Sequence, residues 1–380
     1  RRQMELFIGV ALVALAIAGT IWARRESRDE VFAGVTPGLL PAPGQPSERR
    51  LLSRGEQPPI AVRFEPPTGL RPGLAGVIID SRVDAVELSA TLIDLAIRGW
   101  LVLKPIAPDG SQTRPNGWEL HQVPNPPAEA LTRTEQAVLA AAFGNGPVST
   151  VAELRAGHRL QEAARLLGEE SAEHGWFRPA SARWVRSVGW IALLLGTFLI
   201  STGLIWAGLG ALAAGVIAVA GTRGLGQPLS AEGYAARVQT LGFRQYLATA
   251  EAEQLRFEVG VDVFGRYLPY AMVLGVVDHW RTVFANALRA DLAAGEELAG
   301  FGWLALDDAL TGLLLVDLLT SDFGLLDNLG EGFGGELEGV DAGLDSSDIG
   351  ADSGGIEWGG GGDGGDGGWG GFDGFDGGFD

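Results

Sequence analysis

The sequence of 380 residues contains no cysteine. This absence excludes disulfide bonds, thiolate metal sites and cysteine nucleophiles. The four histidines are widely spaced and form no ligand pair (His121, His158, His174 and His279). The motifs GxxxxGKS/T, HExxH and GxSxG are also missing, and the GxGxxG match at 360–365 lies in glycine-rich low-complexity sequence. The sequence therefore predicts no catalytic, metal-binding or cofactor-binding residue, no cofactor and no identifiable small-molecule ligand.

Basic residues are missing from the last quarter of the chain. Residues 1–290 hold all 28 basic residues and 26 of the 47 acidic ones, so this part is close to neutral. The other 21 acidic residues lie in 291–380 and set the formal net charge of −19. Such an acidic segment is typical of an interaction or solvating tail, and it repels nucleic-acid phosphates.

Residues 6–23 form an uncharged apolar run, with Arg1 before it and Arg24 and Arg25 after it. A helix of this length spans about 27 Å, close to the hydrocarbon thickness of a bilayer. The alternative is a secretory signal peptide with small residues at 16–18 as its cleavage site. The length of the run and the basic cluster behind it favour a transmembrane helix.

A second uncharged stretch separates Arg186 from Arg223. A single helix over it would be about 54 Å long, nearly twice the bilayer core, so we predict a transmembrane helical hairpin at 187–222. Its turn is expected within 201–208, and its glycines allow close helix packing. Basic residues flank both ends, so the positive-inside rule predicts that residues 24–187 and 222–380 are cytoplasmic.

Between the spans, residues 24–58 are rich in Pro, Gly and Arg and predict a linker. Residues 59–126 predict a winged-helix-like α+β module, because helix, helix and hairpin follow in that order. Its expected elements are a strand, two helices and two further strands (60–64, 74–79, 84–98, 100–104 and 117–123). Gly99 is expected to end the second helix in a left-handed cap.

Three helix starts in 59–180 carry the spacing of a capping box. Asp84 with Glu87, Thr132 with Glu135, and Thr150 with Glu153 place a carboxylate three residues after the cap. The second pair opens a helical extension predicted over 127–180.

A winged helix is a DNA-binding fold in many proteins. The charge of this region therefore indicates whether DNA or a protein is the expected partner. The helix before the hairpin carries Glu87 and Asp94 and ends in a single base, Arg98. Residues 59–180 hold 11 basic and 14 acidic residues, whereas a DNA reader normally has a basic surface. We therefore expect no nucleic-acid partner, and a protein-contact or structural module instead.

After the hairpin, residues 229–290 predict a cytoplasmic helical segment. A helix is expected over 230–257 with a break at Gly242, and a second helix is expected to start at Pro269.

The final 90 residues divide into two predicted segments. Residues 291–321 predict an acidic amphipathic segment, which either packs on the rest of the protein or docks in a groove on a partner. Residues 322–380 are rich in Gly and Asp and predict a disordered tail, because they have too little apolar surface to form a core. The tail lacks the repeat register of calcium-binding Gly-Asp repeats.

Two pairs of segments, 66–76 with 90–100 and 242–251 with 267–271, follow in that order along the chain. They resemble the YciQ-like predicted membrane proteins of bacteria, a family with a domain of unknown function. The resemblance implies a bacterial cytoplasmic membrane protein and a strand-rich extracytoplasmic domain before the first span. Because no such domain precedes residue 6 in the sequence, which starts at Arg1, we expect a trimmed chain.

Taken together, these features predict a mainly α membrane protein with three transmembrane helices. Our leading hypothesis is a non-enzymatic scaffold or sensor that presents the module and the acidic tail to a protein partner. One alternative is a subunit of a membrane enzyme or transporter with an unrecognised site, although the hairpin carries no charge for an ion path. A further alternative is a membrane-tethered DNA-binding regulator.

Overall fold

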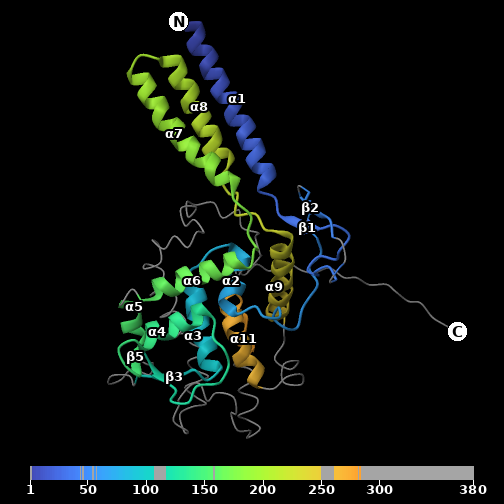
Figure 1. Cartoon of the computed structure of the whole chain (residues 1–380), viewed down its shortest axis with the longest axis vertical. Helices are drawn as coiled ribbons and strands as arrows, with labels where there is room; N and C mark the ends of the chain where they lie inside the picture. The colour runs from blue at the N-terminus through green and yellow to red at the C-terminus, as the bar shows by residue number, and fades with distance from the viewer. Residues whose placement is uncertain are drawn as a thin grey trace, which may run out of the picture.

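The computed structural model describes residues 2–283, apart from 43, 45–46, 54, 57, 107–116, 157–158, 250–260 and 281. The predicted acidic segment (291–321) and tail (322–380) lie outside the described residues. The described part is mainly helical. It has a long bundle of three helices that stands on a larger body, and the N-terminus lies at the far end of the bundle (Figure 1).

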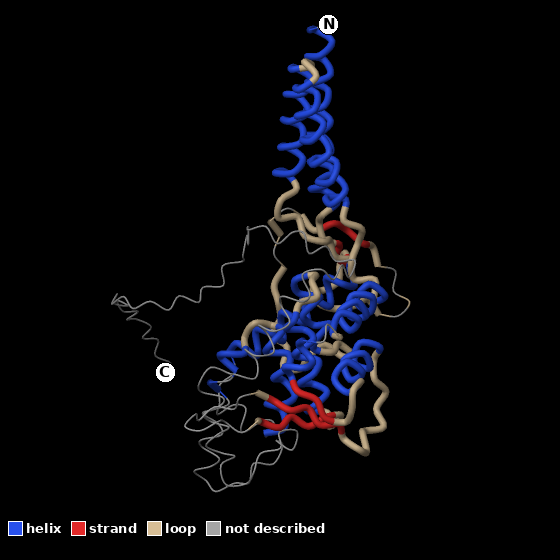
Figure 2. Tube along the Cα trace, turned by 90° about the vertical axis from the view of Figure 1, so that its left-hand side faces the viewer, coloured by secondary structure: helices blue, strands red, loops and turns tan. Residues whose placement is uncertain are grey.

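The bundle contains α1 (Arg2–Glu26), α7 (Ser181–Ser201) and α8 (Ile205–Gly221). The first of these is helical over the segment predicted as a transmembrane helix at 6–23. The other two form the predicted hairpin, whose tight turn includes Gly203 at φ 87°. The three helices lie side by side along their length in both views (Figure 1, Figure 2).

Glycines allow the three helices to approach closely, as expected for helix packing in a membrane. A Cβ added to Gly210 of α8 would overlap the Cα atom of Gly9 in α1, so these helices cross glycine to glycine. Between α7 and α8, a Cβ on Gly196 would lie 2.9 Å from the carbonyl oxygen of Gly208.

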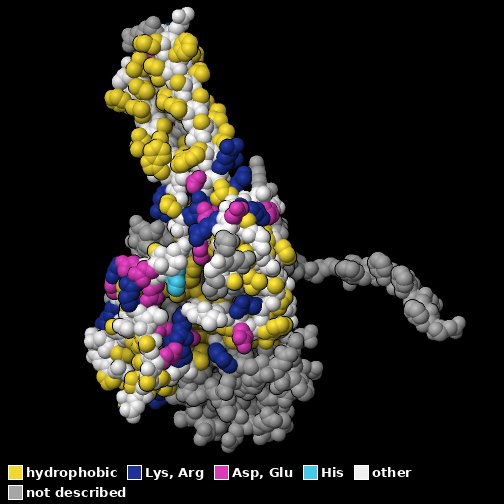
Figure 3. All heavy atoms as spheres, turned by 45° about the vertical axis from the view of Figure 1, so that its right-hand side comes forward, with side chains coloured by type: hydrophobic (Ala, Val, Ile, Leu, Met, Phe, Trp, Pro, Cys, Tyr) yellow, Lys and Arg dark blue, Asp and Glu magenta, His cyan; other side chains and the backbone are white. Residues whose placement is uncertain are grey.

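The outer surface of the bundle is apolar. Large exposed side chains on α1 and α7 include Phe7, Val10, Leu15, Ile191, Leu194 and Phe198. Figure 3 shows this apolar surface as a band along the bundle, with charged side chains gathered where the body begins. By length and composition, α1 and α7 are long and apolar enough to cross a membrane, and α8 is a shorter apolar helix.

The body contains two small antiparallel sheets and several helices among the described residues. Its first part consists of a hairpin of β1 (Glu30–Phe32) and β2 (Arg49–Leu51), then α2 (Pro72–Asp80), α3 (Ala85–Ile97), β3 (Leu101–Pro105), β4 (Trp118–Gln122), α4 (Arg133–Phe143), β5 (Val148–Thr150), α5 (Val151–Ala156) and α6 (Leu160–Glu173). After the bundle come α9 (Ala231–Thr249) and α11 (Val261–Val273). The second sheet has the order β3-β4-β5, at the end of the body away from the bundle (Figure 2).

Helix α3 is the central element of the body. It contacts α2, α4, α6, α11 and β3, and all its residues from 87 to 96 are buried. The expected order of two helices and two strands is present, and Gly99 has φ 83° after α3. An additional strand, β5, pairs with β4 (Leu120 opposite Ser149). The sheet therefore includes residues beyond position 126, where the module was predicted to end.

The segments before and after the bundle form one core. Phe243 of α9 packs edge-on against Tyr267 and Tyr270 of α11, with ring centroids 5.0 and 5.7 Å apart. The hydroxyl of Tyr270 donates to the carbonyl of Leu70, at 2.7 Å. The described chain beyond the hairpin therefore completes the fold that begins before it.

Three local predictions are wrong. No strand forms at 60–64, where the chain instead runs past α9 and the Arg63 N–H donates to the Gly242 carbonyl at 3.1 Å. Helix α9 continues through Gly242, whose missing side chain makes room for the Ala61 carbonyl. Pro269 lies inside α11 and does not start a helix.

Candidate functional site

The junction between bundle and body is formed by three linkers that are hydrogen-bonded to one another. The linker after α1 contacts the linker after α8, where the Glu30 N–H donates to the Leu229 carbonyl at 3.0 Å. The linker before α7 also contacts the linker after α8, because the Arg178 N–H donates to the Pro228 carbonyl at 2.8 Å. All three helices of the bundle are thus attached to the body through one network.

Side chains strengthen this junction. The Arg178 guanidinium lies 2.8 Å from the Glu26 carboxylate and 3.2 Å from that of Glu30. The Asp29 carboxylate accepts a hydrogen bond from the Leu229 N–H at 2.8 Å. These contacts join the end of α1 to residues about 150 and 200 positions later in the chain.

The junction is rich in arginine. We call the following residues the junction arginines: Arg24, Arg25, Arg28, Arg178, Arg183, Arg186 and Arg223. Some are held by backbone carbonyls at the end of α8, since Arg24 Nε donates to Gly221 at 2.8 Å and Arg186 Nη2 donates to Thr222 at 2.6 Å. Figure 3 shows dark-blue side chains gathered at this level, directly below the apolar band.

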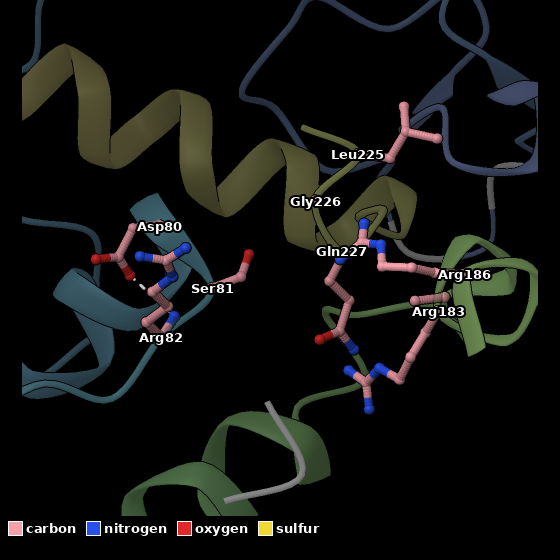
Figure 4. A pocket seen from close by; sticks show the side chains of 9 residues that line it. Asp80, Ser81, Arg82, Arg183, Arg186, Leu225, Gly226 and Gln227 are labelled. Atoms are coloured by element: carbon pink, nitrogen blue, oxygen red, sulfur yellow. Dashed lines mark hydrogen bonds between the residues drawn. The ribbon is translucent and has the colours of Figure 1, made fainter. Parts of the chain in front are cut away.

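A cavity of about 90 Å³ opens beside the junction. We call it the junction cavity, and its lining comes from the end of α2, the start of α7 and the linker after α8 (Asp80, Ser81, Arg82, Ala180, Arg183, Arg186, Leu225, Gly226 and Gln227). In Figure 4, Arg183, Arg186 and Gln227 lie on one side of it, and Asp80 with Arg82 lies on the other. The Asp80 carboxylate accepts from the Arg82 backbone N–H at 2.9 Å.

A second group of charges runs from the surface of the body to its interior. We call Arg71, Asp94, Arg98, Glu129 and Glu135 the ion cluster. Arg98 lies 2.7 Å from Glu135 and 3.1 Å from Asp94, and both carboxylates are buried. Arg71 contacts Glu129 and lies 3.5 Å from Glu135. Burial raises the pKa of Asp94 to about 6 against the opposing effect of Arg98 and Arg71.

Glu135 also caps α4, because its carboxylate accepts from the Thr132 N–H at 2.9 Å, as the capping-box spacing predicts. The ion cluster therefore fixes the start of α4 against the end of α3. Glu135 thus both caps α4 and pairs with Arg98, which gives the ion cluster a structural role.

Glu87 is a buried carboxyl group near other acids. Its side chain is 1% exposed and accepts from the Asp84 N–H at 2.8 Å. Burial raises the pKa of Glu87 well above its ordinary value, and the neighbouring carboxylates of Asp80 and Asp84 raise it further. Glycine at position 76 leaves room for this carboxyl group.

We expect the Glu87→Gln variant to be more heat-stable than the native protein at pH 8 and equally stable at pH 4. An acid whose pKa is raised on folding costs stability as the pH rises through the folded-state pKa, and glutamine removes that cost while still accepting the capping bond. Thermal unfolding at both pH values tests this. The control is Glu153→Gln, which changes an exposed capping-box glutamate bonded to the Thr150 N–H and should show no comparable pH-dependent gain.

The histidines do not come together. His121 pairs with Glu119 at 2.8 Å on β4, His174 stacks on Trp176 with ring centroids 4.3 Å apart, and His279 follows α11. His158 lies outside the described residues. Among the residues that the structure describes, no group of three or more His, Asp or Glu could hold a metal ion.

Sequence reasoning missed both charged features. Arg98 at the end of α3 and Glu135 in α4 are 37 residues apart, so spacing could not pair them. The junction cavity combines residues near 80, 183 and 226, which only the fold brings together. For the junction cavity, the available signal in the sequence was the set of basic residues that flank the hairpin.

These observations define a class of protein: a helical protein with an apolar bundle and a folded body at one end of it. Two helices of the bundle are long and apolar enough to cross a membrane. The family model described as the C-terminal domain of a predicted membrane protein (DUF2207) matches residues 60–284, more than half of the chain. The chain belongs to this family of predicted membrane proteins of unknown function, which confirms the resemblance seen in the sequence. No curated protein and no solved structure matches it.

Proposed function

We propose that this chain is a non-enzymatic, multi-pass protein of the bacterial cytoplasmic membrane that serves as a scaffold or sensor. The observation that carries the proposal is the junction, where all three bundle helices are hydrogen-bonded to one body. A displacement of the bundle would therefore act on the whole body, which suits a protein that couples the bilayer to a soluble partner.

In this proposal α1, α7 and α8 all span the bilayer. Helix α8 has 17 residues and would be about 25 Å long, a little short of a typical hydrocarbon core. Its close packing against the other two helices and its lack of charge support a third span. Local thinning of the bilayer accommodates such a short helix at modest cost.

The body lies in the cytoplasm in this proposal. The junction arginines lie at the body end of the bundle, and arginine and lysine concentrate on the cytoplasmic side of membrane proteins. The N-terminus and the turn between α7 and α8 then lie outside.

The proposed partner is a protein and not DNA. The body keeps the helix, helix, strand, strand order of a winged-helix-like module, but α3 stands where such a module has its recognition helix. Because nearly all of α3 is buried by other elements, it has no face that could enter a major groove. Candidate contact surfaces are the exposed, charged side of α6 and the acidic residues 291–380.

The test compares cross-linked partners in native membranes for the full chain, for a chain ending at residue 321, and for an Arg165→Glu variant on the exposed side of α6. We expect at least one partner to be lost from one of the altered chains while each stays in the membrane. Identical partners in all three would contradict the scaffold proposal. Turnover or solute flux by the purified, reconstituted protein would favour the enzyme or transporter alternative.

A further inference from the structure

We propose that the junction cavity binds the phosphate group of an anionic membrane phospholipid. The inference rests on the three-span placement above and goes beyond it, because it assigns a ligand to a defined site. It follows from the chemistry of the lining, its depth relative to the apolar surface and its size.

The lining favours a phosphate. Arg183 and Arg186 are three positions apart on α7, so they lie on the same side of the helix, and both line the cavity. A guanidinium offers five N–H donors in a planar fork that matches phosphate oxygens. The bond from Arg186 to the Thr222 carbonyl, at 2.6 Å, fixes the position of this guanidinium at the cavity.

Other polar groups of the cavity fit the same ligand. Gln227 faces the cavity beside Arg183, where its amide can donate to a phosphate oxygen (Figure 4). The single carboxylate of the lining, Asp80, lies on the opposite side next to Arg82. Three arginines against one carboxylate give the lining an excess of positive charge.

The cavity lies at the depth of lipid headgroups. Trp184 and Trp190 stand on either side of Arg186 in the α7 sequence and are 68% and 56% exposed. Exposed tryptophans are typical of the interface between hydrocarbon and water. Exposed apolar residues continue from Val188 upward, only about 3 Å along the helix from Arg186. A phospholipid beside α7 would therefore carry its phosphate at the level of the cavity.

The size also decides between ligands. Pockets for whole small molecules enclose roughly 300–1,000 Å³. A cavity of about 90 Å³ suits one phosphate group whose attached chains remain outside, in the bilayer. A free phosphate ion has the same chemistry, and the experiment below separates the two sources.

The experiment uses the full chain, purified in a neutral detergent after incubation with vesicles of phosphatidylcholine and phosphatidylglycerol. Native mass spectrometry then measures the phosphatidylglycerol that each protein retains. The cavity variant is Arg183→Gln with Arg186→Gln. The matched control is Arg25→Gln with Arg223→Gln, which removes the same charge from exposed junction arginines that do not line this cavity.

We expect the cavity variant to bind phosphatidylglycerol about tenfold more weakly or worse, since each charge-assisted hydrogen bond contributes at least one such factor. The control should retain it nearly as well as the native chain. A double lysine variant at 183 and 186 keeps the charge without the fork and should bind at an intermediate level, which keeps the test valid if the glutamine variant misfolds. Equal loss in the cavity variant and the control, or no loss in either, would overturn the proposal.

Two further measurements separate related failures. Titration of lipid-free protein with inorganic phosphate should show much weaker binding than phosphatidylglycerol does. Binding of phosphate that depends on Arg183 and Arg186, with no such dependence for the lipid, would overturn the lipid as occupant. Release of the protein from membranes by alkaline carbonate would instead contradict the three-span placement, independently of lipid retention.

Discussion

The Arg98→Met variant should unfold about 6–20 °C below the native protein. Removing one partner of a buried ion pair costs about 3–5 kcal/mol, and each kcal/mol shifts the Tm of a domain of this size by about 2–4 °C. Arg98 is 13% exposed and contacts Asp94 and Glu135, which are 8% and 2% exposed. Methionine keeps the apolar stem of the side chain, so the loss reports on charge and hydrogen bonding.

The control for this prediction is Arg165→Met on α6. Arg165 also contacts two carboxylates, those of Glu162 and Glu169, but it is 46% exposed. Exposed pairs of this kind are screened by solvent and contribute little to stability, so the control should unfold close to the native protein. Scanning calorimetry or intrinsic tryptophan fluorescence in detergent measures both. Similar Tm values for the two variants would show that the ion cluster does not stabilise the body.

The Gly9→Leu variant should separate α1 from the rest of the bundle, whereas Gly19→Leu in the same helix should not. A Cβ on Gly9 would lie 2.9 Å from the Trp206 carbonyl and 3.4 Å from the Gly210 Cα atom, both of which belong to backbone and cannot yield locally. A Cβ on Gly19 meets nothing within 4 Å. Both substitutions add the same apolar volume, so only the packing differs.

Limited proteolysis of the two variants in detergent measures this separation. We expect faster cleavage between α1 and β1 in Gly9→Leu, because α1 then no longer holds its linker in the junction network. The Gly19→Leu chain should be cleaved like the native one. Equal cleavage rates in the two variants would contradict the arrangement of α1 against α8.

Elements whose signals are local could be predicted from the sequence. The pair Thr132 and Glu135 marked the start of α4, Gly99 marked the end of α3, and the 36 uncharged residues between Arg186 and Arg223 fixed the hairpin. Each of these depends on neighbours in the chain and on the thickness of a bilayer, so no tertiary contact was needed.

Predictions failed where tertiary packing overrides local preference. Pro269 disfavours a helix interior by about 3 kcal/mol, but the buried tyrosines on either side of it, Tyr267 and Tyr270, pack against Phe243 and keep α11 intact. Gly242 costs only about 1 kcal/mol in a helix and allows the Ala61 carbonyl to approach α9. The ion cluster and the junction cavity depend in the same way on contacts between distant segments.

In the proposed topology, three helices cross the membrane and the body lies in the cytoplasm. The absence of native cysteine allows a direct test with two single-cysteine chains, Thr202→Cys in the exposed turn between α7 and α8 and Gln161→Cys on the exposed side of α6. Each is treated with a membrane-impermeant maleimide in intact cells and again after permeabilisation. We predict labelling at Thr202 in intact cells and labelling at Gln161 only after permeabilisation. Labelling at Gln161 in intact cells would contradict the account.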